Sequence, residues 1–139
     1  MKLISKFFGL LVLVLLFPAF GYAQQKPLKG DWLFTIQSSS GSLPVVFKFK
    51  KKGKGNFSVP TGTLPLSYRE NGPLFSVSGE LPENDPLFPK TSLIIRGRKN
   101  TDNSITADLI VITPVPTDQN PLGFNSVIVP GAVSGTRQK

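Results

Sequence analysis

The stretch "LKGDWLFTI", residues 28–36, carries the only tryptophan of the chain at the start of an alternating apolar segment. From Trp32 onward, apolar side chains recur at every second position, which is the period of a β-strand with one buried face. Gly30 precedes the tryptophan by two residues, and a residue without a Cβ lets the backbone turn into a strand or approach a neighbour closely. The stretch therefore predicts a first strand with its largest side chain at one end of the core.

Period-two alternation continues along the chain in short segments, which are separated by turns rich in the 13 glycines and 13 prolines. After the first 23 residues, no stretch shows a convincing helical period. The pattern predicts an all-β protein, because alternation bounded by glycine and proline is typical of half-buried strands. The eight predicted strands cover residues 31–37, 43–50, 55–60, 63–69, 74–80, 91–98, 104–112 and 124–137.

Two of the seven connections between these strands are long, and the other five are short. If consecutive strands are neighbours, the long connections 81–90 and 113–123 fall at one end, and only short turns fall at the other. One closed and one open end is the layout of a barrel, and eight antiparallel strands suffice to close a sheet. We therefore predict an eight-stranded antiparallel meander barrel over residues 24–139. A two-sheet β-sandwich is the alternative that the strand number leaves open.

The first 23 residues have the pattern of a secretory signal peptide. Lys2 and Lys6 precede an apolar run over residues 7–17, and small residues precede the predicted cleavage point after Ala23. The run is shorter than the ~20 residues that a membrane-spanning helix needs. The sequence thus predicts a signal peptide over residues 1–23, a secreted or periplasmic product, and no transmembrane segment in the mature chain.

The two ends of the predicted barrel domain should meet. Counting connections places the start of the first strand and the end of the last strand at the short-turn end, so Arg137 is expected beside Trp32. A guanidinium above an indole ring is a favourable contact of ~0.5–2 kcal/mol. Gly30-Asp31-Trp32, Arg137 and eight antiparallel strands resemble the lipocalin and avidin group of barrels, in which a Gly-x-Trp motif and a late arginine close the base. The resemblance implies a structural role for Gly30, Trp32 and Arg137, and it does not extend to the residues with which avidin holds biotin.

No catalytic constellation is visible. The chain has no histidine and no cysteine, so transition-metal sites of the common kind and disulfides are not expected. Its eight acidic residues are scattered over turns and strands, and no base accompanies the serines of residues 38–42. We expect no enzymatic activity, no metal and no cofactor.

The leading functional hypothesis is an exported, lipocalin-like barrel that binds a small apolar or amphipathic molecule in its open end. Concave apolar openings with a few polar groups are typical ligand sites. The residues expected to line the upper barrel and the long loops are Tyr68, Phe75, Leu87, Phe88 and Phe124.

The segment "KFKKKGKG", residues 48–55, is the strongest charge feature of a chain whose formal net charge is +8. Such a lysine cluster is typical of a solvated hairpin tip, which is the interpretation we favour. The alternative function is a surface that binds polyanions, such as a polysaccharide or anionic envelope components. Nucleic acid is not an expected partner, because no aromatic residue lies among the lysines of the tip itself, residues 50–54. The residues of this basic patch are Lys48, Lys50, Lys51, Lys52 and Lys54.

Overall fold

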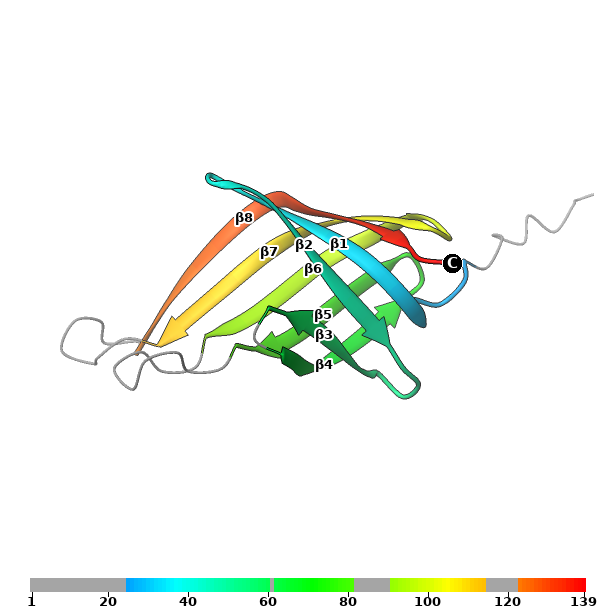
Figure 1. The fold of residues 1–139 in the computed structure, drawn as a ribbon, viewed down its shortest axis with the longest axis horizontal. Coiled ribbons are helices and arrows are strands. Elements are labelled where there is room, and N and C mark those ends of the chain that lie inside the picture. The colour runs from blue at the N-terminus through cyan, green and yellow to red at the C-terminus, as the bar shows by residue number, and fades with distance from the viewer. Residues whose placement is uncertain (1–24, 61, 82–90, 115–122) are drawn as a thin grey trace, which may run out of the picture.

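The chain folds as a closed barrel of eight antiparallel strands in sequence order (Figure 1). The computed structural model describes residues 25–60, 62–81, 91–114 and 123–139. Each strand pairs with the next along the chain, and β1 pairs with β8 to close the sheet. The predicted meander barrel is thereby confirmed in place of the sandwich. The strands are β1 (Gly30–Ser38), β2 (Gly41–Phe49), β3 (Lys54–Val59), β4 (Gly62–Asn71), β5 (Leu74–Glu80), β6 (Ser92–Thr101), β7 (Ser104–Pro114) and β8 (Phe124–Arg137).

The strands continue further into the turns than the sequence pattern indicates. β4 extends to Asn71, which pairs with Leu74, and β6 extends to Thr101, which pairs with Ser104. Both turns therefore have two-residue loops, although their polar residues had indicated longer connections. Tight two-residue connections are the commonest way to join antiparallel strands, because their twist matches that of the sheet.

The two ends of the barrel differ in their connections. The base is the end at which the β2–β3, β4–β5 and β6–β7 turns lie, together with the start of β1 and the end of β8. The mouth is the opposite end, to which the other connections lead. The long connections at the mouth, residues 82–90 and 115–122, lie outside the described residues, as does the predicted signal peptide.

Aromatic side chains from the first three strands pack together in the interior. Phe34 stacks on Phe47 with ring centroids 4.4 Å apart, and Phe47 stacks on Phe57 at 5.5 Å. Trp32 meets the edge of Phe34 at 6.4 Å. Offset and edge-on contacts at these separations add to the free energy gained from burying the rings. These inward-facing residues come from alternate positions of β1, β2 and β3, as the period-two pattern predicts.

A glycine makes the closure between β1 and β8 possible. Gly135 pairs with Phe34 across the two strands. A Cβ at position 135 would lie 2.7 Å from Phe34 Cδ1 and 2.8 Å from Ile105 Cγ1. Only a residue without a side chain lets the phenylalanine ring lie directly against β8 at this point.

β8 closes the barrel over only part of its length. It pairs with β1 through residues 133–137, whereas its pairing with β7 runs from Phe124 to Thr136 with a register shift between Ala107 and Leu109. β1 and β8 therefore separate toward the mouth, as Figure 1 shows. Among the residues described, no helix has the length and apolar character that crossing a bilayer requires.

Candidate functional site

The base of the barrel is closed around Trp32. Its indole N–H donates a hydrogen bond of 2.7 Å to the carbonyl of Leu28, and both residues are fully buried. The Arg137 guanidinium carbon lies 4.7 Å from the centroid of the Trp32 ring, and the two residues are register partners on β1 and β8. The predicted meeting of Trp32 and Arg137 is confirmed.

Arg137 also binds three backbone carbonyls, which belong to residues 27–29 and to the β6–β7 turn. Its Nε donates to the Asp102 carbonyl at 2.9 Å, Nη1 donates to the Lys29 carbonyl at 2.6 Å, and Nη2 donates to the Pro27 carbonyl at 2.8 Å. Gly30 adopts a φ of +119°, and a Cβ there would lie 3.3 Å from Arg137 Nη1. The planar fork of arginine is suited to such multiple contacts. Gly30 and Arg137 therefore anchor the segment that leads into β1 across the base.

A buried ion pair, which sequence analysis did not identify, completes the base. Lys99 Nζ lies 2.9 Å from Glu70 Oε1, with side-chain exposures of 3% and 20%. The same ammonium donates to the Lys26 carbonyl at 3.2 Å, and Glu70 Oε1 accepts the Leu28 backbone N–H at 2.9 Å. Both charges are thus paired and hydrogen-bonded, as buried charges must be. With this network in place, residues 25–29 cover the base.

A small apolar cavity lies in the mouth half of the interior. Its volume is about 120 Å³. Phe47 and Phe57 stack on its base side, while Ile36, Leu43 and Leu81 come from strand ends near the mouth. Every residue that lines it is apolar or glycine. The lining residues are Ile36, Leu43, Val45, Phe47, Phe57, Val59, Leu66, Val77, Gly79, Leu81, Leu93 and Ile95.

The cavity is small for a ligand site. Pockets that enclose a drug-sized molecule usually measure ~300–1,000 Å³. An apolar cavity of ~150 Å³ is known to stay dry and to accept benzene. The space between Phe47, Phe57 and Val77 is therefore suited to one ring or a short alkyl chain.

Polar side chains of the β1–β2 turn at the mouth are bonded to one another and to the backbone. Ser38 Oγ lies 3.0 Å from Ser40 Oγ and donates to the Gly41 carbonyl at 2.9 Å. Ser42 Oγ donates to the Gln37 side-chain oxygen at 2.8 Å. These hydroxyls stabilise the β1–β2 turn and remain exposed, so they can also meet the polar part of a molecule that enters the mouth.

The predicted ligand-binding residues do not gather at the cavity. Tyr68 and Phe75 lie in the base half, so their expected place in the upper barrel is wrong. The reason is strand direction: β4 runs from the mouth to the base, and the two residues flank the β4–β5 turn. Phe124 lies at the mouth end of β8, where it pairs with Pro114 and is 44% exposed. Leu87 and Phe88 fall outside the described residues.

Tyr68 contributes to the base instead. Its ring meets the edge of Phe49 with centroids 4.9 Å apart, and its hydroxyl donates to the Lys50 carbonyl. Burial raises the pKa of this hydroxyl above its ordinary value of 10.0, and the charge of Glu70 raises the pKa further. The folded state therefore favours the protonated hydroxyl, which is the form that donates to Lys50.

This pKa shift predicts a pH dependence of stability. Because the folded-state pKa is raised, the contribution of Tyr68 is fully present below pH 10 and is lost as the pH rises through the folded-state pKa. As the pH rises above 10, the free energy of unfolding should fall less for Tyr68→Phe than for the wild-type chain. Denaturant unfolding at a series of pH values checks this, and the variant retains every lysine, so lysine titration cancels in the comparison. Equal slopes for both proteins would contradict the prediction.

The predicted basic patch surrounds the β2–β3 turn at the base. Lys48 lies 3.6 Å from Asp31, in a pair that is about half exposed, and Lys54 Nζ donates to Ser67 Oγ at 3.2 Å. Lys50, Lys51 and Lys52 are exposed. The side chains of these three form no ion pair within the part of the chain that the structure describes.

The described residues contain no group of three or more His, Cys, Asp or Glu side chains placed to hold a metal ion. Comparisons with protein-family models, curated proteins and solved structures gave no significant match. The closed barrel is compatible with the resemblance to the lipocalin and avidin group, and this compatibility concerns the fold alone.

Proposed function

We propose that this protein is an exported binding protein that takes the apolar part of a small amphipathic molecule into the mouth of its barrel. The observation that supports the proposal is the cavity of about 120 Å³, which is lined by apolar residues and glycine. The base is covered by residues 25–29, so a ligand would enter from the mouth. The predicted signal peptide supports an extracytoplasmic location.

The size of the cavity constrains the ligand. Burying one methylene group contributes about 0.8 kcal/mol, so a chain of about four carbons would contribute roughly 3 kcal/mol. Micromolar affinity requires about 8 kcal/mol. The polar part of the ligand must therefore contribute at the mouth, where the serines of the β1–β2 turn are exposed. This reasoning favours an amphipathic ligand over a purely apolar one.

A series of straight-chain alkyl carboxylates tests the proposal by isothermal titration calorimetry. We expect affinity to rise about fourfold for each added methylene until the cavity is full, and then to level off. Val77→Phe places a ring in the cavity and should weaken binding at least tenfold. Val46→Phe is the matched control, because it makes the same change on the outer face of β2.

Two results would contradict a cavity site. One is an affinity that does not depend on chain length. The other is an equal loss of affinity in Val77→Phe and Val46→Phe. Thermal unfolding of both variants checks that a loss of binding is not a loss of the fold, since overpacking a core can itself destabilise by ~1–3 kcal/mol.

A second candidate function has its own observation. Lys50, Lys51 and Lys52 project from the β2–β3 turn with no acid partner in the described ranges, whereas Lys48 and Lys54 are engaged with Asp31 and Ser67. Unneutralised lysines at a turn attract polyanions and anionic envelope components. Binding through them should weaken steeply with added salt, whereas binding in an apolar cavity should not.

A further inference from the structure

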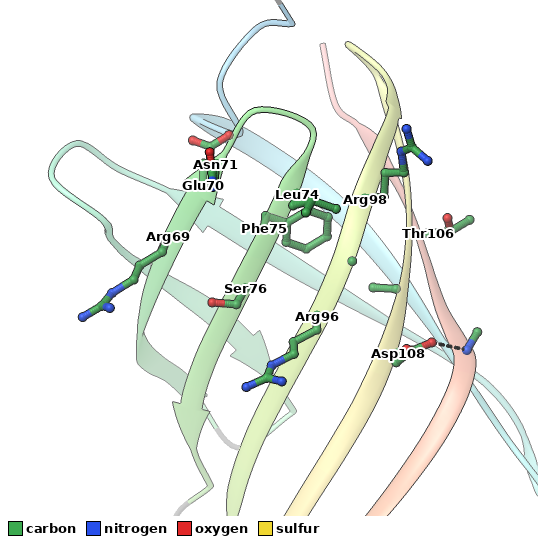
Figure 2. Close-up of a pocket in the computed structure, with 13 residues that line it drawn as sticks. Arg69, Glu70, Asn71, Leu74, Phe75, Ser76, Arg96, Arg98, Thr106 and Asp108 are labelled. Atoms are coloured by element: carbon green, nitrogen blue, oxygen red, sulfur yellow. Dashed lines mark hydrogen bonds between the residues drawn. The ribbon is translucent and has the colours of Figure 1, made fainter.

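The outer wall of the barrel carries a groove that is separate from the cavity (Figure 2). It extends from β4 to β8 and measures about 730 Å³. Three of the four arginines of the chain, Arg69, Arg96 and Arg98, line it. The fourth, Arg137, belongs to the base. This concentration of arginine on one face is not needed by the fold, because none of the three packs into the core.

Strand register places these arginines in order. Arg69 pairs with Ser76, Ser76 pairs with Arg96, and Arg96 pairs with Asp108, so the four residues form one row across β4, β5, β6 and β7. Adjacent strands lie ~4.8 Å apart, so the backbones at the two arginines are ~10 Å apart. Figure 2 shows Arg69 and Arg96 on either side of Ser76. Arg98 follows two positions further along β6, beside Leu74.

The acids of the groove are already engaged. Glu70 pairs with the buried Lys99 at 2.9 Å, and Asp108 Oδ1 accepts the Gly131 backbone N–H at 2.7 Å (Figure 2). None of the three arginines forms an ion pair or a side-chain hydrogen bond within the described ranges. The groove therefore presents three exposed guanidinium groups that form no ion pair among the described residues, and its arginines outnumber its acids by three to two. Guanidinium forks match the geometry of carboxylate, sulfate and phosphate oxygens.

The shape and lining of the groove favour one class of occupant. Phe75 is 5% exposed and offers no ring for stacking, which argues against single-stranded nucleic acid. A recess on a convex barrel wall is poorly suited to the flat surface of a bilayer. Among the residues that line the groove, Leu74 is the one exposed large apolar side chain, so little apolar surface is offered to lipid. A thin polymer can enter such a recess. Ser76, Asn71 and Thr106 add polar groups that suit sugar hydroxyls.

We propose that this groove binds a linear acidic polysaccharide, with Arg69, Arg96 and Arg98 receiving its anionic groups. The site is independent of the cavity and of the function proposed for it. It also differs from the lysine turn, because strand register places the three arginines around one groove, whereas the lysines lie on a turn.

Binding of polygalacturonate, a linear carboxylated polysaccharide, tests the proposal, with uncharged dextran as the control polymer. The triple variant Arg69→Gln, Arg96→Gln, Arg98→Gln should bind about a hundredfold more weakly than wild type, at about fivefold for each contact. The magnitude of the salt slope should fall by about one for each arginine removed. The matched control is Lys50→Gln, Lys51→Gln, Lys52→Gln, which removes the same charge from the turn and should change the affinity less than threefold.

The competing outcomes are distinct. Equal loss in the two triple variants would show that binding follows net charge alone, and a loss only in the lysine variant would place the site at the turn. Either result overturns the proposal. Binding to phosphatidylglycerol vesicles but not to polygalacturonate would also overturn it, in favour of a membrane surface. The titration of alkyl carboxylates tests only the cavity. A negative result there would leave the groove proposal standing, so the two proposals can fail separately.

A measurement on the wild-type chain does not depend on the folding of any variant. Phenylglyoxal modifies exposed arginines, and mass spectrometry reports the extent at each position. Polygalacturonate should protect Arg69, Arg96 and Arg98 at least threefold, while dextran should not. Unchanged modification at all three positions in the presence of bound polygalacturonate would contradict the assigned site.

Discussion

Replacing Lys99 with methionine is expected to lower the free energy of unfolding by about 3 kcal/mol, because the change leaves the Glu70 carboxylate at the base without its cation. Removing one partner of a buried ion pair typically costs about 3–5 kcal/mol. We expect the lower end of that range, since Glu70 retains 20% exposure and can be partly hydrated. The variant also loses the hydrogen bond from Lys99 to the Lys26 carbonyl, which helps to hold the segment that covers the base.

The double variant Lys99→Met, Glu70→Gln is the control for this prediction. Glutamine at position 70 can still accept the Leu28 N–H through its side-chain oxygen, and it carries no charge to be left unpaired. Most of the lost stability should therefore return. Denaturant unfolding followed by Trp32 emission measures all three proteins. If Lys99→Met were as stable as wild type, the pair would contribute nothing, and water would have to replace the ammonium at the base.

The strand order and closure of the barrel follow from local sequence signals. Inward positions carry apolar residues at period two, and glycine or proline marks the connections, so strands such as 74–80 and 124–137 have the bounds that the pattern predicts. The contact of Trp32 with Arg137 also follows, because the number of connections between them determines at which end each residue lies. In a meander, the pairing of consecutive strands is local in sequence, and only the pairing of β1 with β8 that closes the barrel is long-range.

The ion pair at the base was missed although its signal is present. Glu70 continues the inward alternation of Leu66 and Tyr68, and Lys99 continues that of Ile95 and Gly97. A charged residue near a turn is usually solvated, so Glu70 and Lys99 are expected to be exposed despite their inward positions in the alternation. Two opposite charges at inward positions next to the same end of a barrel are the pattern that would have identified the pair.

The cavity and the groove could not be read from the sequence for a different reason. The volume left inside a barrel depends on how rings such as Phe47 and Phe57 stack, and composition does not specify their rotamers. Arg96 and Arg98 stand out as outward positions, but their relation to Arg69 depends on the register of two further strand pairs. Register between strands is a three-dimensional result, and a slip of one residue would place these side chains on the other face.

Replacing Arg137, at the end of β8, is expected to cause a second large loss of stability. Arg137→Ala should lower the free energy of unfolding by about 3 kcal/mol, because it removes three hydrogen bonds from a charged donor and a cation–π contact. The expected loss is smaller than it would be for fully buried hydrogen bonds, because the bonds to the Pro27 and Lys29 carbonyls are exposed to water. Loss of the guanidinium also uncovers one face of the indole, so Trp32 emission should shift to longer wavelength and acrylamide quenching should increase.

Arg137→Lys separates charge from geometry at the same position. Lysine keeps the positive charge and most of the stem, but its single ammonium cannot reach the Pro27, Lys29 and Asp102 carbonyls in the planar arrangement of the arginine fork. We expect it to recover less than half of the stability that Arg137→Ala loses, and to leave quenching of Trp32 intermediate. If lysine restored full stability, charge near the indole would be the main contribution. If alanine left both emission and stability unchanged, the backbone pairing of β1 with β8 would hold the base closed without the arginine.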